Sequence, residues 1–274
     1  VGEMEGYLPM DGAAFGGHPD VVSALLDAGL KADVPHEYDR LTPLWRCTWM
    51  DGGSGQSHHY EAAARLVENG ADPNYIVPEG LHDHPGEAHT PLQSAVVHGQ
   101  TEMLRLFLKN LPSGDGEGDQ MSDGHGIAQE GGSATDAGRH QRLLARSEAV
   151  NLAPPPHKWS SLHLAMAALS DDSADGEVTA SIVAELIVAG GDLWQQNAAG
   201  KTPLDMAKEA IVAGLGPATF PTTAVAWVER LEGAGMVPPA SLVSAARAVE
   251  TREKKLETEK KENRKSKKKK QSLS

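Results

Sequence analysis

The tripeptide Thr42-Pro43-Leu44 decides the fold, because the chain repeats it at several later places. It returns as Thr90-Pro91-Leu92 and as Thr202-Pro203-Leu204, and a looser copy, Ser161-Leu162-His163-Leu164-Ala165, lies between the last two. A stretch of the same shape at 8–14 precedes them all, so that successive copies start 34, 48, 70 and 42 residues apart. Such self-similarity is typical of repeat proteins, in which one small unit of secondary structure is used several times.

The repeated tripeptide also predicts where a helix begins. A Thr side chain at the N-cap accepts a hydrogen bond from a free backbone N–H, and Pro at the first helical position loses no hydrogen bond there. The phrase after each tripeptide predicts a second helix, because its apolar residues fall four apart on one face. That spacing is clearest for Val21/Val22 with Leu25/Leu26 and for Met103/Leu104 with Phe107/Leu108. Gly29, Gly70 and Gly190 are expected to end these second helices in the left-handed conformation.

Together the two phrases resemble the ankyrin repeat, whose pattern runs T-P-L-H-x-A-A, then G-H, then V-V-x-x-L-L and G-A-D-x-N. The resemblance covers about residues 7–235 apart from insertions, and it implies an all-α solenoid of about five units, each a pair of helices with a hairpin-like turn. Because one unit cannot bury its apolar stripe alone, the units are expected to stack. The pattern's His is kept only at His163, and its other places hold Asp11, Trp45, Gln93 and Asp205. We therefore expect the hydrogen bond of that His to be lost in most units.

The lengths between the copies predict how the chain is divided. The segments are units 1–3 at 7–111, a flexible Gly- and acid-rich insertion at 112–156, units 4 and 5 at 157–235, a capping helix at 239–256 and a disordered basic tail at 257–274. Within the insertion, 139–151 is either a degenerate unit that lost its first helix or a plain capping helix. The helix at 239–256 is expected to present one apolar face made of Leu242, Ala246, Val249 and Leu256.

Charge divides the chain into an acidic body and a basic end. Residues 251–274 carry 11 Lys and Arg against 4 Glu, a net charge of +7, and the other 250 residues carry 14 bases against 34 acids, a net charge of −20. An acidic body repels nucleic acid and anionic lipid, so we expect only the tail to contact either one. The body favours instead a protein partner with a basic surface. No run of 18 apolar residues is present, so no transmembrane segment is expected.

The sequence contains no motif for catalysis, metal binding or cofactor binding. Cys47 is the only cysteine, which excludes a disulfide within the chain and a zinc site built on cysteine pairs. Histidines gather at His58-His59 and between His82 and His89, in Gly- and Pro-rich stretches without helical spacing. We therefore expect no enzymatic activity, no metal and no cofactor.

One row of residues is the candidate binding surface. In an ankyrin unit the eighth residue of the first helix faces the groove, and the resemblance assigns this place to Phe15, Trp49, Val97, Ala167 and Glu209. The first three are expected to form an apolar strip along the concave side, flanked by Arg46 and Ser94. Aromatic residues and Arg are frequent anchors of protein interfaces. Alternatively, Trp49 folds inward to fill space beside a neighbouring insertion.

Turn tips between units are the second contact surface that the resemblance implies. One junction carries His36, Glu37 and Tyr38, and the next carries Tyr75, Ile76 and Val77. Tyr and Ile at an exposed tip predict contact with a partner. Alternatively, Ile76 and Val77 simply pair across their turn.

The basic tail has more than one interpretation. Its cluster resembles a nuclear localisation signal and includes Arg264, Lys265, Lys267, Lys268, Lys269 and Lys270. The other interpretations are a solvated tail that lies against the acidic body and a tail that contacts RNA or an anionic membrane. The resemblance as a whole implies a monomeric protein–protein interaction module of the cytoplasm, the nucleus or both. The alternative is a nuclear regulatory or nucleic-acid-associated factor that binds through this tail.

Overall fold

The structure is a computed structural model that describes residues 8–49, 56–78, 87–111, 146–169, 175–215, 217, 219–252 and 255. This described part is helical and contains no strand, which confirms the expected all-α class. Its labelled helices are α1 (Pro9–Phe15), α2 (Pro19–Asp27), α3 (Pro43–Thr48), α4 (Gln56–Glu68), α5 (Pro91–Val97), α6 (Thr101–Asn110), α7 (Arg146–Val150), α8 (Ser161–Ala168), α9 (Gly176–Val188), α10 (Pro203–Val212) and α11 (Ala224–Gly233). A further helix covers 240–252.

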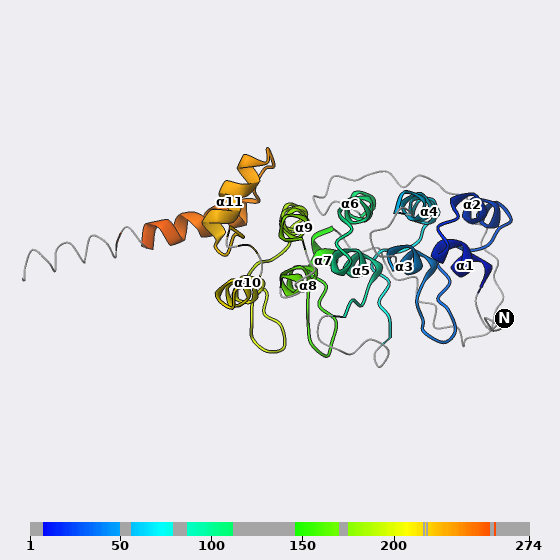
Figure 1. Cartoon of the computed structure of the whole chain (residues 1–274), viewed down its shortest axis with the longest axis horizontal. Coiled ribbons are helices and arrows are strands. Elements are labelled where there is room, and N and C mark those ends of the chain that lie inside the picture. The colour runs from blue at the N-terminus through cyan, green and yellow to red at the C-terminus, as the bar shows by residue number, and fades with distance from the viewer. Residues whose placement is uncertain are drawn as a thin grey trace, which may run out of the picture.

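The helices form two rows of stacked pairs (Figure 1). The first helices of the pairs, α1, α3, α5, α8 and α10, follow one another along one row, and each contacts the next. The second helices, α2, α4, α6 and α9, form the row beside it and contact one another in the same order. Each pair therefore buries its apolar faces against the pairs before and after it.

Local sequence rules explain where these helices begin and end. The N-cap hydroxyls of Thr42, Thr90 and Thr202 accept hydrogen bonds from the backbone N–H three residues on, at 3.4, 3.1 and 3.2 Å. A proline follows each of these threonines at the start of its helix. Gly29, Gly70 and Gly190 have φ of 87°, 90° and 97°, a conformation that glycine adopts without steric cost. The expected caps and stops are therefore confirmed.

The third helical position carries a capping side chain in several pairs. His163 Nδ1 accepts from the backbone N–H of Ser160 at 3.2 Å, and its Nε2 donates to the carbonyl oxygen of Lys201 in the next loop at 3.1 Å. Asp205 caps its own helix, since its carboxylate accepts from both the N–H and the hydroxyl of Thr202. The histidine thus links two pairs, whereas the aspartate closes only one helix.

Gln93 takes over the linking role of the histidine in the third pair. Its Oε1 accepts from the backbone N–H of His89 at 2.9 Å. Its Nε2 donates to the carbonyl oxygens of Leu152 at 3.0 Å and Trp159 at 3.3 Å, both in the next loop. The expected loss of this link is therefore wrong for Gln93, because an amide offers an acceptor and two donors where imidazole offers one of each.

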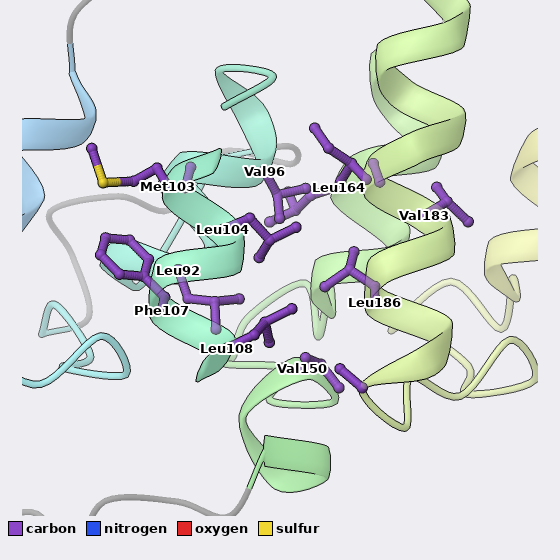
Figure 2. Packing of buried hydrophobic residues seen from close by; sticks show 14 of the residues in the cluster. Leu92, Val96, Met103, Leu104, Phe107, Leu108, Val150, Leu164, Val183 and Leu186 are labelled. Carbon is purple, nitrogen blue, oxygen red and sulfur yellow. The ribbon is translucent and has the colours of Figure 1, made fainter. Parts of the chain in front are cut away.

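One apolar core runs through the stack from Met10 to Ala246. In Figure 2, Met103 and Phe107 point to one side of α6, and Leu104 and Leu108 point to the other, toward Leu186 of α9. All four side chains of α6 are buried, as the stripe in the sequence predicted. A middle helix can bury two faces because it has a neighbour on each side.

The far end of the stack departs from expectation in one place. The helix at 240–252 buries Leu242 and Ala246, but Val249 is 42% exposed. The prediction that Val249 shares the buried face is wrong, because the side chains around it are exposed from 247 onward. Leu256 and the basic tail lie outside the described residues.

Most of the insertion at 112–156 also lies outside the described residues, including 139–145. What the structure describes is the short helix α7, with Ala149 and Val150 buried. Asn151, directly after it, accepts from the backbone N–H of Asp192 at 2.7 Å and donates to the carbonyl oxygen of Gly190 at 2.9 Å. The end of the insertion is thus attached to the loop that follows α9.

Candidate binding surface

Three large apolar side chains are exposed at equivalent places in the first three pairs. Phe15 and Val97 are the last residues of α1 and α5, and Trp49 is the C-cap of α3. Their exposed fractions are 42%, 38% and 48%. Trp49 therefore faces solvent rather than filling the core. We call Phe15, Trp49 and Val97 the edge row.

Arg46 supports the edge row from the interior instead of flanking it. Its guanidinium carbon lies 5.6 Å from the centroid of the Trp49 ring, a cation–π distance. Its Nη2 donates to Asp39 Oδ2 at 2.6 Å, and the side chain is only 1% exposed. The prediction of Arg46 as a surface contact is therefore wrong, because a carboxylate in the preceding loop holds it inside. Ser94, also expected at the surface, is buried and accepts from the hydroxyl of Thr48.

The ion pair of Arg46 belongs to a group of four titratable side chains, of which all but Asp39 are buried. His36 Nδ1 lies 3.1 Å from Asp39 Oδ1, and Asp11 is fully buried nearby. Burial raises the pKa of Asp11, against the opposing effect of Arg46 and His36. Burial also favours neutral Asp39, but the hydrogen bond and charge of Arg46 prevail and hold the pKa of Asp39 below its ordinary value. This cluster of two acids and two bases joins the first pair to the second.

A cavity of about 230 Å³ lies beside the edge row, and we call it the edge cavity. Its lining is Cys47, His59, Tyr60, Val178 and the five residues at 99–103. His59 Nε2 lies 3.0 Å from the carbonyl oxygen of Phe15, and Gln100 Nε2 donates to that of Thr48 at 3.1 Å. His59 of α4 thus reaches back to the end of α1, and Gln100, the N-cap of α6, reaches back to the end of α3. These bonds place the edge cavity next to the backbone of the edge row.

Cys47 is the only nucleophile of note in the edge cavity, and its environment suppresses reactivity. The thiol is fully buried and contacts the carbonyl oxygen of Ala14 at 3.8 Å. Burial raises the pKa of the Cys47 thiol well above its ordinary value. A thiol becomes a nucleophile as thiolate, which this site disfavours. The site therefore offers shape and apolar surface rather than an activated group.

A larger cavity, of about 500 Å³, lies in the last two pairs, between α8, α10 and the loops at 157–159 and 197–201. Ala167 and Glu209, the counterparts of the edge row in these pairs, contribute to its lining. Lys201 Nζ bonds Glu209 Oε2 at 2.5 Å across its rim. The same place in the fold is therefore apolar in the first three pairs and charged in the last.

The turn tips divide into buried and exposed residues. Tyr38 is 69% exposed, whereas His36 is buried with its Nδ1 beside Asp39 and presents no surface to a partner. Tyr75 is half-buried against a small cluster of Leu41, Trp45, Val77 and Ala88. Val77 donates its backbone N–H to the carbonyl oxygen of His89 at 3.0 Å, so it pairs across the turn, and Ile76 beside it is half-buried. Tyr38 is the tip residue most open to contact.

Two further exposed aromatics, Tyr60 and Trp194, were not predicted from the sequence. Tyr60 lines the edge cavity and is 38% exposed, and Trp194 is 43% exposed in the loop after α9. Tyr60 precedes Glu61 as Thr101 precedes Glu102, so aligning the second helices would have placed it beside the cavity. Trp194 follows an Asp turn, in which its N–H donates to Asp192 Oδ1, and no repeat position marks it.

Possible ligands for a metal do not converge in the described part of the chain, where no group of three His, Cys, Asp or Glu is suitably placed. His82, Asp83 and His84 lie outside it, as do the tail residues 264–270. No described helix is long and apolar enough to cross a bilayer. Neither the family models nor the curated proteins include a match to this chain.

Proposed function

We propose that the chain is an ankyrin-type solenoid that binds another protein and has no chemistry of its own. The observation that carries the proposal is the edge row, three large apolar side chains exposed at equivalent places beside a cavity. A soluble surface usually shows such residues singly, and rows of them indicate contact sites. Localisation in the cytoplasm or nucleus is part of the same proposal.

The scaffold supports this function because its links fix the edge row. The carbonyl oxygens of Phe15 and Thr48 are each hydrogen-bonded by a side chain of the next second helix. Arg46 lies against the Trp49 ring. A surface that is rigid before binding loses less conformational entropy when a partner binds. Tyr38 at the tip is the second contact that we propose, on the strength of its exposure.

A matched pair of substitutions tests the proposal. Trp49→Ala and Trp194→Ala remove the same side chain at similar exposure, one from the edge row and one from the loop after α9. Partners captured from a cell extract by the intact chain should fall at least about tenfold with Trp49→Ala and change little with Trp194→Ala. Circular dichroism must show that both variants keep their helices. Equal capture by both variants would contradict the assignment of this surface.

A further inference from the structure

The described residues around the starts of the second helices carry acids but no Lys or Arg. Within 15–20, 58–61, 97–102 and 175–178 the described chain holds no Lys or Arg. The same segments carry the exposed carboxylates Asp20, Glu61, Glu102, Asp175 and Glu177. The opposite edge of the stack is mixed, since bases such as Lys31, Arg40, Lys158 and Lys201 lie there among acids.

Three of these acids follow the edge row in register. Asp20 and Glu102 each come five residues after their edge-row residue, Phe15 and Val97. Glu61 holds the same place in the second pair, because it lies nine residues before Gly70 as Asp20 lies nine before Gly29. The edge therefore presents an apolar row and a parallel acidic row, which we call the acidic row (Asp20, Glu61 and Glu102).

The acidic row keeps negative charge after its internal pairs are counted. Glu102 bonds Arg105 at 2.6 Å, but Arg105 is shared with Glu185 at 2.7 Å, so this group retains one negative charge. Asp20 and Glu61 are exposed, and no Lys or Arg lies in their own segments. At the next pair, Glu177 bonds Arg230 while Asp175 caps α9. An uncompensated row of carboxylates attracts a cationic partner over about 8–10 Å at physiological salt.

The edge cavity adjoins the acidic row, since Glu102 lines it, and it is the right size for one large side chain. Its 230 Å³ falls below the roughly 300–1,000 Å³ usual for small-molecule pockets. Tyr60 and Met103 line it, and Cys47 closes it from inside. Apolar anchors in such pockets, surrounded by charge pairs at the rim, are the usual arrangement of a protein interface.

We propose that this edge of the first three pairs docks a basic amphipathic segment of another protein. One large apolar side chain of the segment enters the edge cavity, others contact the edge row, and its Lys or Arg side chains face the acidic row. This inference rests on the proposed binding function and adds where the partner lies and what chemistry it carries.

Two other occupants fit the surface less well. The chain's own tail, 257–274, supplies eight Lys and Arg, but its one large apolar residue is Leu273, next to the end. A second copy would bring a body with a net charge of −20 against this acidic edge. A separate protein segment that carries both apolar and basic residues matches both rows.

The probe is a display library of random 16-residue peptides selected on the full chain. Enriched peptides should combine Trp, Phe, Leu or Met with several Lys or Arg. Enrichment of acidic or uncharged peptides, or no enrichment at all, would overturn the inference. Synthetic copies of the enriched peptides then give dissociation constants by fluorescence anisotropy.

Two triple variants of equal charge locate the peptide. Asp20→Asn/Glu61→Gln/Glu102→Gln should weaken binding about tenfold at 50 mM NaCl and less than about twofold at 500 mM, because salt screens exposed charges. Asp27→Asn/Glu229→Gln/Glu232→Gln removes three exposed acids elsewhere and should change binding less than about twofold. Equal weakening by both would assign the effect to net charge and overturn the docking site.

Further arms separate the proposals from each other. If Trp49→Ala weakens peptide binding and the acidic-row variant does not, the result supports the proposed binding function and contradicts the proposal of a basic partner. If truncation after Leu256 strengthens peptide binding about tenfold or more, the chain's own tail is the occupant. If the full chain sediments as a dimer, and the acidic-row variant changes the amount of that dimer, the occupant is a second copy of the chain. A monomer with unchanged affinity after truncation is the expected result.

Discussion

The first three helix pairs and the last two share one scaffold but present different surfaces. Both halves use a third-position side chain to reach the next loop, Gln93 in one and His163 in the other. The place that holds Phe15, Trp49 and Val97 in the first half holds Ala167 and Glu209 in the second. Four of these five residues are exposed and Ala167 is half-buried, so these residues do little for the fold. Stacking is therefore common to the described helix pairs of both halves, whereas the apolar edge belongs to the first half.

The largest effect is expected from a core residue that packs between the halves. Leu104 of α6 is fully buried and faces α9. Leu104→Ala should lower the free energy of unfolding by ~2–5 kcal/mol, through lost apolar burial and the cavity left behind. Urea titration followed by circular dichroism measures this change.

The control is Val212→Ala at the exposed end of α10, where Val212 is 89% exposed, and it should shift stability by less than ~0.5 kcal/mol. We expect a single cooperative unfolding transition, whose urea midpoint shifts as a whole with Leu104→Ala. Two transitions, of which only one moves with Leu104→Ala, would show that the halves unfold separately.

The next effect concerns a carboxyl in the first half whose counterpart in the second half is an amide. Asp33 Oδ2 accepts from the backbone N–H of Asp72 at 3.2 Å, as Asn151 Oδ1 accepts from that of Asp192. Burial raises the pKa of Asp33 from 3.8 to about 6. The folded chain therefore holds a proton that the unfolded chain releases, and the stability from neutral Asp33 is lost as pH rises from about 4 through 6.

Asp33→Asn keeps the acceptor and removes the charge. At pH 7.5 it should stabilise the chain by on the order of 2–3 kcal/mol, and the gain should shrink toward pH 4, as urea midpoints at both pH values would show. The mirror change, Asn151→Asp, should destabilise at pH 7.5, because Asn151 also donates to two carbonyl oxygens. A gain from Asp33→Asn that does not depend on pH would contradict this account.

A smaller effect tests whether Gln93 and His163 are interchangeable links. Gln93→Ala removes one acceptor and two donor bonds at the junction, and should cost ~1–3 kcal/mol in thermal or urea unfolding. Gln93→His and His163→Gln should each keep most of the stability of their own junction, because each places the other half's side chain in an equivalent site. If both exchanges cost as much as alanine, the two junctions differ in geometry and the comparison fails at this point.

Rules that act within a few residues explain why the fold was predictable. The Thr42 side chain caps its own helix by accepting a hydrogen bond from the backbone N–H three residues on, and Gly29 ends a helix through its own positive φ. The sequence therefore contains both signals. The stripe that includes Leu104 and Phe107 follows from helical spacing alone. Val249 was misplaced because spacing shows which residues share a face, but not where the neighbour that covers that face ends.

The candidate site was less predictable, because its parts come from different pairs. Arg46 was expected at the surface, and it is held inside by Asp39 of the preceding loop, which no helical spacing relates to it. The edge cavity depends on the spacing between α4, α6 and α9, which the sequence of a single unit does not specify. Trp49 could be placed only once Arg46 was found behind its ring.

The smallest effect on stability is expected from removing the basic tail. Truncation after Leu256 leaves the core from Met10 to Ala246 intact, so the unfolding free energy should change by less than ~0.5 kcal/mol. The eight Lys and Arg of 257–274 act, in our interpretation, on localisation or nucleic acid. Truncation should therefore abolish either the nuclear signal of a fluorescent fusion or gel-shift binding to RNA, while Trp49-dependent capture of a protein partner persists. If capture disappears with the tail, binding is not confined to the stacked pairs, and the contrast between their two halves does not locate the partner.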